Sequence, residues 1–184
     1  MLETERLRLR RWKESHRAPF ASINADPRVM EWLGPPLSRA QSDAMIERAE
    51  EHFRKHGFGP YAVELRETEG CIGFVALMIP SFASHFTPCV EIGWRLAAEA
   101  WGHGYATEGA RALMDHAFSK LGLRELVSFT AAENWRSRRV MERLGMTHDP
   151  ADDFDHPRLV ESDPLRRHVL YRTKRAGMRS HDVG

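Results

Sequence analysis

The stretch of sequence that constrains the fold most is AWGHGYATEGARAL, from Ala100 to Leu113, which places three glycines at the start of an amphipathic helix. Glycine is a poor helix former, so another property of this residue explains its presence here. The first turn of a helix leaves four backbone N–H groups without partners and carries a partial positive charge. Glycine lets an anion approach these groups and lets the chain adopt positive φ angles. The stretch is therefore a candidate phosphate site, although the glycines alone indicate a plain tight turn equally well.

Two common phosphate-binding motifs do not match the stretch. A dinucleotide-binding G-x-G-x-x-G that starts at Gly102 would need a glycine at Thr107. A P-loop that starts at Gly104 has Gly109 at the right spacing but lacks the Lys-Ser/Thr pair that must follow. The glycines must therefore belong to a different kind of loop.

Hydrophobic periodicity predicts short strands on both sides of this stretch, with amphipathic helices between them. The expected strands cover residues 7–12, 61–65, 71–78, 89–96, 126–130 and 168–173. The expected helices cover residues 15–24, 38–57, 106–121 and 134–144, and a capping box of Ser38 and Gln41 opens the second of them. Three meandering strands followed by strand–helix–strand–helix–strand indicate an α/β or α+β sheet domain with one βαβ crossover.

Composition argues against several classes of protein. The 184 residues suit one domain, and 27 basic against 26 acidic residues leave a net charge of +1, which argues against a nucleic-acid partner. No apolar run reaches the roughly 18 residues of a membrane span, and the N-terminus lacks the apolar segment of a signal peptide, so we expect a cytoplasmic protein without a membrane partner. Cys71 and Cys89 form no CxxC pair, and His148–Pro157 lacks the glycine and glutamate of a calcium loop. We therefore predict no metal site.

The hexad WGHGYA, Trp101–Ala106, resembles the R/Q-x-x-G-x-G/A loop of the GCN5-related N-acetyltransferases (GNAT), with Trp101 in place of the usual Arg or Gln. Its flanks strengthen the resemblance. VEIGWRL before the loop, ENWRSRRVMERLGM (Glu133–Met146) after it, and the opening LETERLRLRRW are all similar to the RimJ/RimL-like branch of that superfamily. The resemblance covers residues 2–173. It implies one acetyltransferase domain over residues 1–173, and the sequence of residues 174–184 indicates a flexible C-terminal tail.

The resemblance implies a GNAT fold, in which a central mixed, mostly antiparallel sheet splays between two parallel strands and helices cover both faces. Acetyl-CoA would lie as a cosubstrate between the parallel strands, here 89–96 and 126–130. Its pantetheine arm would pair with the first strand along Trp94, Arg95 and Leu96, and the Leu96 N–H would bind the thioester carbonyl and the oxyanion formed during transfer. The backbone N–H groups of Gly102, His103, Gly104, Tyr105, Ala106 and Thr107 would bind the pyrophosphate, and Thr107 would also offer its hydroxyl. Trp101 belongs to the same cofactor-binding loop.

The resemblance also implies a second cofactor segment, the N-x-x-S motif from Asn134 to Ser137. Asn134 is expected to cap its helix and to reach the pantetheine arm with its amide. Ser137 is the expected proton donor to the leaving thiolate, because Met141 occupies the position where many relatives carry a tyrosine. Arg138 is a candidate ligand of the adenosine 3′-phosphate, together with Arg139, although an arginine run on a helix is also typical of a solvated face.

The implied reaction is the direct attack of a neutral primary amine on the thioester in a ternary complex. A lysine-type amine with a pKa of about 10.4 is almost entirely protonated at pH 7, so a general base matters most for that class of acceptor. Glu91, on the strand beside the thioester, is the candidate base. A sheet carboxylate paired with an arginine is the alternative interpretation of this residue.

The acceptor stays open among small amines, including polyamines and antibiotics, and protein N-termini. Family analogy places the walls of its pocket at Asn24–Pro36, Ser81–Thr87 and the loop His148–Pro157. A homodimer is compatible with the family. The alternative function is a non-catalytic acyl-CoA-binding or sensing domain, which the missing tyrosine favours and which Glu91 and Ser137 disfavour.

Overall fold

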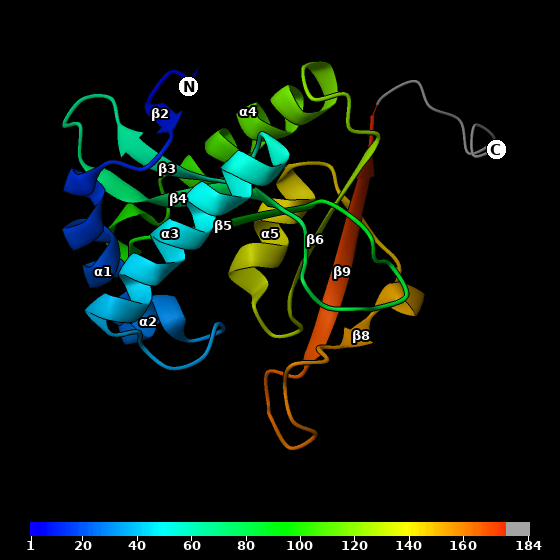
Figure 1. Ribbon diagram of the computed structural model, residues 1–184. Coiled ribbons are helices and arrows are strands. Elements are labelled where there is room, and N and C mark those ends of the chain that lie inside the picture. The colour runs from blue at the N-terminus through cyan, green and yellow to red at the C-terminus, as the bar shows by residue number, and fades with distance from the viewer. Residues whose placement is uncertain (176–184) are drawn as a thin grey trace. The chain divides into compact units, whose positions relative to one another are not determined.

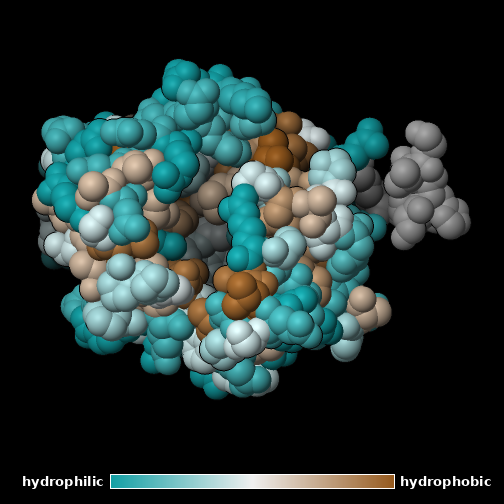
Figure 2. Space-filling view, turned by 60° about the horizontal axis from the view of Figure 1, so that its bottom comes forward, coloured by the Kyte–Doolittle hydropathy of each residue, from teal (hydrophilic) through white to brown (hydrophobic). Residues whose placement is uncertain are grey.

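The computed structural model describes residues 1–175, and the chain forms two compact units. Unit 1 comprises Met1–Met78 and Ile92–Leu113, and unit 2 comprises Ile79–Glu91 and the chain from Met114 onward. Figure 1 follows the chain from its N-terminal strands in blue to its last strand in red. On the face seen in Figure 2, hydrophilic residues cover most of the surface and hydrophobic residues occur in smaller groups. Among the described residues, no helix has the length and apolar character that a membrane span needs.

Unit 1 is built on a sheet whose strands follow chain order. These strands are β1 (Leu2–Glu3), β2 (Leu7–Arg10), β3 (Pro60–Leu65), β4 (Cys71–Met78) and all but the first residue of β5 (Glu91–Leu96). Strands β1 to β4 pair antiparallel, with Leu9 opposite Val63, and the predicted hairpin of β3 and β4 is confirmed. The first long strand ends at Arg10 instead of the predicted Trp12. The indole N–H of Trp12 donates to the Pro60 carbonyl at 2.8 Å, and the chain then turns away from the sheet.

The helices of unit 1 surround this sheet. They are η1 (Glu14–His16), α1 (Arg17–Ala25), α2 (Pro27–Met30), α3 (Arg39–His56), η2 (Ala98–Ala100) and the first turns of α4 (Tyr105–Ser119). The predicted capping box of α3 is confirmed, because Ser38 Oγ accepts from the Gln41 N–H at 3.2 Å and Gln41 Oε1 accepts from the Ser38 N–H at 2.8 Å. The helix ends before Gly57, whose φ of 78° is left-handed.

Helices cover both faces of the sheet in unit 1, as the resemblance implies. On one face, Phe20 of α1 and Ile46 of α3 pack with Phe74 of β4. On the other face, Gly109 of α4 lies so close to Val75 that an added Cβ would be 3.1 Å from the valine side chain. Neighbouring residues of a strand point to opposite faces, so Phe74 and Val75 bury β4 on its two sides.

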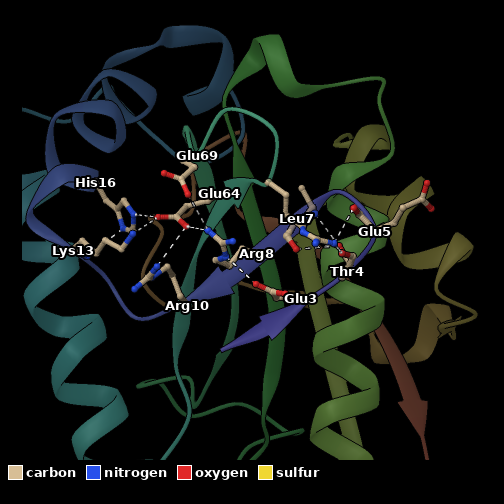
Figure 3. Close-up of polar contacts among 11 residues, drawn as sticks. Glu3, Thr4, Glu5, Leu7, Arg8, Arg10, Lys13, His16, Glu64 and Glu69 are labelled. Carbon is tan, nitrogen blue, oxygen red and sulfur yellow. Dashed lines mark hydrogen bonds and ion pairs between the residues drawn. The ribbon is translucent and has the colours of Figure 1, made fainter.

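A buried carboxylate ties the N-terminal segment to this sheet (Figure 3). Glu64 of β3 is 1% exposed, and its Oε1 accepts from Lys13 Nζ at 2.9 Å and lies 2.7 Å from His16 Nε2. Arg8 and Arg10 lie 3.7 Å from its other oxygen. Burial by itself raises the pKa of Glu64, but the hydrogen bonds from Lys13 and His16 outweigh burial and the net pKa is lowered. The ionised carboxylate therefore holds β2 and η1 against β3.

Unit 2 is organised around its last strand. Its elements are β6 (Glu125–Ala131), α5 (Trp135–Arg143), β7 (Thr147–His148), η3 (Pro150–Asp152), β8 (Phe154–Asp155) and β9 (Arg167–Lys174), after the end of α4. Strand β9 pairs antiparallel with β6 over the whole length of β6, and both β7 and β8 also pair with β9. Glu91, the first residue of β5, pairs parallel with Val127 of β6. The sheet is therefore mixed, and the predicted α/β fold class is confirmed.

Three boundaries differ from the sequence predictions. Strand β5 begins at Glu91 instead of Cys89. Helix α4 ends at Ser119, two residues short of the predicted end. Lys174, expected in the tail, is the last residue of β9 and pairs with Glu125. The rest of the expected tail, from residue 176 onward, lies outside the described residues.

Candidate functional site

The predicted site residues fall into two groups, one in each unit. Unit 1 holds the strand and loop residues Trp94, Arg95, Leu96, Trp101, Gly102, His103, Gly104, Tyr105, Ala106 and Thr107. Unit 2 holds Glu91, Asn134, Ser137 and Arg138.

Two glycines shape the turn that precedes α4. Gly102 and Gly104 have φ angles of 81° and 82°, in the left-handed region that only glycine adopts without strain. A Cβ added to Gly102 would meet no atom of the described residues within 4 Å, so the turn requires the positive φ that glycine allows and does not depend on the small size of glycine. The expectation of positive φ in this loop is confirmed. Such turns direct successive backbone N–H groups to one side and make concave anion sites.

Two residues between β1 and β2, Thr4 and Arg6, hold this turn and the start of α4 in place. Arg6 Nη1 donates to the carbonyl of His103 at 3.0 Å, and Arg6 Nε donates to Glu108 in the first turns of α4 at 2.7 Å. Thr4 Oγ1 donates to the same carboxylate at 2.5 Å. The Arg6 guanidinium also lies 4.7 Å from the centre of the Tyr105 ring. Sequence reasoning missed Thr4, Arg6 and Glu108, and the only signal for them was the opening segment quoted for the family resemblance.

The end of β5 is fixed by two further contacts. The indole Nε1 of Trp101 donates to the carbonyl of Leu96 at 3.0 Å, which gives this unusual loop residue a structural role. On the other side, β4 approaches β5 so closely at Gly73 that an added Cβ would lie 2.1 Å from the carbonyl oxygen of Arg95. Backbone groups of Arg95 and Leu96 are therefore held rigidly, as a site that uses strand N–H groups requires.

In unit 2, Asn134 caps α5 as predicted. Its Oδ1 accepts from the Ser137 N–H at 3.2 Å, and its Nδ2 donates to Thr130 Oγ1 at 2.9 Å and to Ser137 Oγ at 3.3 Å. Both amide N–H groups are therefore used inside the unit, and Oδ1 keeps one lone pair for a ligand. Because Ser137 Oγ accepts from Asn134, its own O–H remains able to donate. This arrangement is compatible with the roles expected of both residues.

Two other residues of α5, Arg138 and Met141, are held by contacts or burial within unit 2. The Arg138 guanidinium lies 4.0 Å from the centre of the Trp135 ring, and its Nη1 donates to the carbonyl of Ala132 at 2.9 Å. Met141 is 1% exposed. The methionine at the position of the family's tyrosine thus belongs to the core of unit 2.

Glu91 is the most perturbed carboxyl group of the site. The residue keeps part of its surface accessible, yet desolvation raises the pKa of its carboxyl to about 8. No arginine or lysine among residues 1–175 forms an ion pair with it, so the alternative of a paired sheet carboxylate is not what the structure shows. An unpaired carboxyl group with a pKa near neutrality has the property that a general base needs.

Two segments expected to line the acceptor pocket meet in an aromatic cluster of unit 2. Phe82 of the first segment stacks on Phe154 of the second, with ring centres 6.3 Å apart, and lies 4.8 Å from the His156 ring. His156 in turn lies 5.0 Å from the ring of His168, which is 8% exposed. Arg158 Nη2 donates to the Ser81 carbonyl at 3.2 Å. The two segments therefore pack against each other through their aromatic rings.

This cluster predicts a loss of stability in mild acid. Desolvation lowers the pKa of His156 and of His168, so the unfolded chain binds more protons than the folded chain below the ordinary histidine pKa of about 6.5. The stability that these two histidines contribute should be complete above that pH and should be lost as the pH drops through the lowered values. Urea unfolding at pH 7.5 and 5.5 measures the change in stability, and on going to pH 5.5 His168→Phe should lose less stability, or gain more, than the wild type. An unchanged pH dependence in that variant would contradict this assignment.

Comparison with known proteins was made on sequence and on structure. The family model for the acetyltransferase (GNAT) domain matches residues 6–147. The FsC-acetyl coenzyme A-N(2)-transacetylase of Aspergillus fumigatus is 32% identical over 163 residues, covering 80% of this chain and 65% of that protein. The chain therefore spans less than two thirds of that relative's length.

Two solved structures illustrate the shared fold. An acetyltransferase of Agrobacterium tumefaciens superposes with a TM-score of 0.76 at 32% identity, covering 95% of this chain and 94% of that one. The ribosomal L7/L12 alpha-N-protein acetyltransferase RimL, solved in complex with coenzyme A, superposes with a TM-score of 0.75 at 17% identity, covering 93% and 95%. The second likeness concerns the fold alone.

Proposed function

Because the chain belongs to the GNAT family of acetyltransferases, we propose that it transfers the acetyl group of acetyl-CoA to a primary amine. The observation that carries the proposal is the left-handed turn at Gly102 and Gly104, placed at the start of α4 and braced by Arg6 and Glu108. A turn of this kind offers backbone N–H groups and a helix N-terminus to a diphosphate. Its position in the sequence is the one that the family resemblance requires.

In this proposal, unit 1 binds the cofactor chiefly through its backbone. The N–H groups from Gly102 to Thr107 hold the pyrophosphate, and the edge of β5 from Trp94 to Leu96 pairs with the pantetheine arm. The close contact at Gly73 supports the second role, because it fixes the strand on the side of β4. From unit 2, Asn134 Oδ1 accepts a hydrogen bond from the arm.

The chemistry needs one bond formed and one broken. The amine nitrogen bonds to the thioester carbon, the Leu96 N–H stabilises the resulting oxyanion, and the carbon–sulfur bond then breaks. Glu91 takes the proton that the amine loses, directly or through a water molecule. Ser137 donates to the leaving thiolate, whose ordinary pKa of about 8.5 makes it a moderate leaving group without such help. The unpaired state of Glu91 and the free O–H of Ser137 support these assignments.

The alternative function is an acyl-CoA-binding or sensing domain without turnover. Met141 is the residue that favours it, because its position holds a buried apolar side chain in place of a tyrosine acid. The raised pKa of Glu91 favours catalysis, since a sensing domain has no use for a desolvated, unpaired carboxyl group.

Two measurements on the full chain test the proposal. Calorimetry with acetyl-CoA reports binding, and release of the coenzyme A thiol in the presence of a panel of amines and peptides reports transfer. We expect both binding and turnover. Binding without turnover on any amine would favour the sensing alternative, and the absence of binding would contradict both functions.

The glycine turn gives a sharper prediction. Gly102→Ala should weaken acetyl-CoA binding by about tenfold or more, because alanine disfavours a left-handed φ by about 1–2 kcal/mol and the turn must rearrange its N–H groups. Gly57→Ala is the matched control. Gly57 has a φ of 78° and, like Gly102, no atom within 4 Å of an added Cβ, so it should cost similar stability without affecting binding. Equal affinities of the two variants for acetyl-CoA would contradict the proposed role of the turn.

A further inference from the structure

Arg95 of β5 has unusual surroundings for a cationic side chain. Its Nη1 donates to Asn24 Oδ1 at 2.6 Å and lies 3.7 Å from the Met45 sulfur, and the guanidinium lies 5.7 Å from the centre of the Phe74 ring. Its Nε is buried and has no hydrogen-bond partner among residues 1–175. All these neighbours belong to unit 1 and none of them is charged.

Other arginines of unit 1 have a negatively charged partner. Arg6, Arg8 and Arg28, for example, pair with carboxylates, whereas no carboxylate among residues 1–175 pairs with Arg95. Desolvation is the cause that lowers the pKa of Arg95 to about 10. Proteins rarely bury a charge without a charged partner, because removing an ion from water is unfavourable. The missing counter-ion is therefore a feature that the fold alone does not account for.

The amide that accepts the shorter hydrogen bond from Arg95 is held in a fixed orientation. Asn24 and Ser42 are both fully buried, and Asn24 Nδ2 donates to Ser42 Oγ at 2.8 Å. This bond turns the amide so that Oδ1 faces Arg95. The fold thus keeps the guanidinium in place with a neutral group, which orients the cation and leaves its charge uncompensated.

The position of Arg95 in the chain connects it with the proposed reaction. Arg95 directly precedes Leu96, whose N–H is assigned to the thioester carbonyl. Arg95 as a residue is only partly buried. An acceptor whose amine attacks a thioester held at the Leu96 N–H would therefore bring its other groups close to Arg95.

We propose that Arg95 binds a carboxylate group of the acceptor, so that the substrate class is a small amine that also carries a carboxylate, as an amino acid does. The inference rests on the proposed acetyltransferase function and adds the chemistry of its acceptor. A guanidinium presents its N–H groups as a planar fork that matches the two oxygens of a carboxylate. The acceptor thereby supplies the counter-ion that the fold leaves out.

Matched acceptors measure this preference. Each α-amino acid is compared with its α-amide and with the corresponding decarboxylated amine, and the readout is the ratio of kcat/KM for the acid to that for the amide. We expect a ratio of about ten or more in the wild type, and a loss of about tenfold or more in Arg95→Met, because a charge-assisted pair is lost. Arg17→Met, which removes an arginine already paired with Glu14, should leave the ratio unchanged.

Asn24→Asp separates recognition from a structural role. The variant places a carboxylate against Arg95 with almost no change in shape, so the protein itself supplies the counter-ion. If Arg95 binds the acceptor, the acid-to-amide ratio should fall about tenfold while the thermal midpoint stays the same or rises. If Arg95 merely connects α1 to β5, Asn24→Asp preserves that connection and the ratio stays at its wild-type value, which overturns the inference.

The remaining outcomes are distinguishable. Turnover of amines with an acid-to-amide ratio near one overturns the inference and leaves the proposed function intact. Binding of acetyl-CoA in calorimetry without turnover of any amino acid also overturns the inference. The absence of both binding and turnover overturns the proposed function, and the inference with it.

Discussion

Glu91→Gln is expected to lower kcat/KM by about 10²-fold at pH 8 for an acceptor amine with a pKa of about 10.4. At that pH only about one such amine in 250 is neutral, so a base that takes the proton has a large effect. A carboxylate with an ordinary pKa of 4.5 would be a weak base for this purpose. Desolvation raises the pKa of Glu91 to about 8, which brings it much closer to that of the ammonium ion.

The pH profile separates the base from the ionisation of the amine. In the wild type, kcat/KM should rise with a midpoint near pH 8 and then level off, because the reactive complex needs the carboxylate and the ammonium ion together. In Glu91→Gln the rate should continue to rise by about tenfold per pH unit up to the pKa of the amine, since only neutral amine reacts. Initial rates of thiol release from pH 6.5 to 10 measure both curves.

An acceptor with a pKa of about 8 is the matched control, because half of it is already neutral at pH 8. Its rate should fall only a few-fold in Glu91→Gln. Equal losses for the two acceptors would show that the substitution disturbs positioning and that Glu91 is not the base.

The pH dependence of the free energy of unfolding tests the raised pKa of Glu91 without an activity measurement. The pKa of Glu91 is raised from 4.5 to about 8 in the folded protein, so the folded state binds the proton more tightly than the unfolded state. The resulting stabilisation is complete below pH 4.5 and is lost as the pH rises through 8. Glu91→Gln cannot ionise, and this part of the pH dependence should be missing from its urea unfolding curves.

Gly73→Ala is expected to destabilise the protein by about 3 kcal/mol or more. The new Cβ would lie 2.1 Å from the carbonyl oxygen of Arg95 and 2.9 Å from the Cα of Leu96, and both contacts are with backbone that cannot rotate away. The φ of Gly73 is 132°, which adds conformational strain for alanine. Strand β5 must therefore move away from β4, and acetyl-CoA binding should weaken with it.

Gly57→Ala again serves as the control, because it imposes a left-handed φ without a clash. The free energy of unfolding of both variants, measured in urea, gives the cost of the contact as the difference. Equal destabilisation of the two variants would mean that β5 accommodates the methyl group and that the close approach at Gly73 does not fix the strand.

Local signals in the sequence predicted much of the fold. The capping box at Ser38, the glycine that ends α3 and the hairpin of β3 and β4 each depend on residues close together in the chain. The positive φ angles of the glycine turn were also predictable, because glycines crowded at a helix start are typical of a left-handed backbone. The glycine turn and the Asn134 cap are the parts of the site that share this local character.

Contacts between distant residues were not predictable. The pairing of Arg6 with Glu108 joins residues 102 positions apart, and that of Arg95 with Asn24 joins residues 71 positions apart. Neither has a spacing that a sequence pattern could reveal. The perturbed pKa of Glu91 likewise arises from the density of atoms around it, which only the folded chain determines.

The pairing of β9 with β6, β7 and β8 has a consequence for how the protein is made. On the ribosome, unit 1 has all its residues once Leu113 has emerged, so it can fold while the rest is still being translated. The other three strands of unit 2 must wait for a partner that is synthesised last. Nascent chains arrested before residue 167 should therefore contain a protease-resistant N-terminal part beside an unprotected C-terminal one.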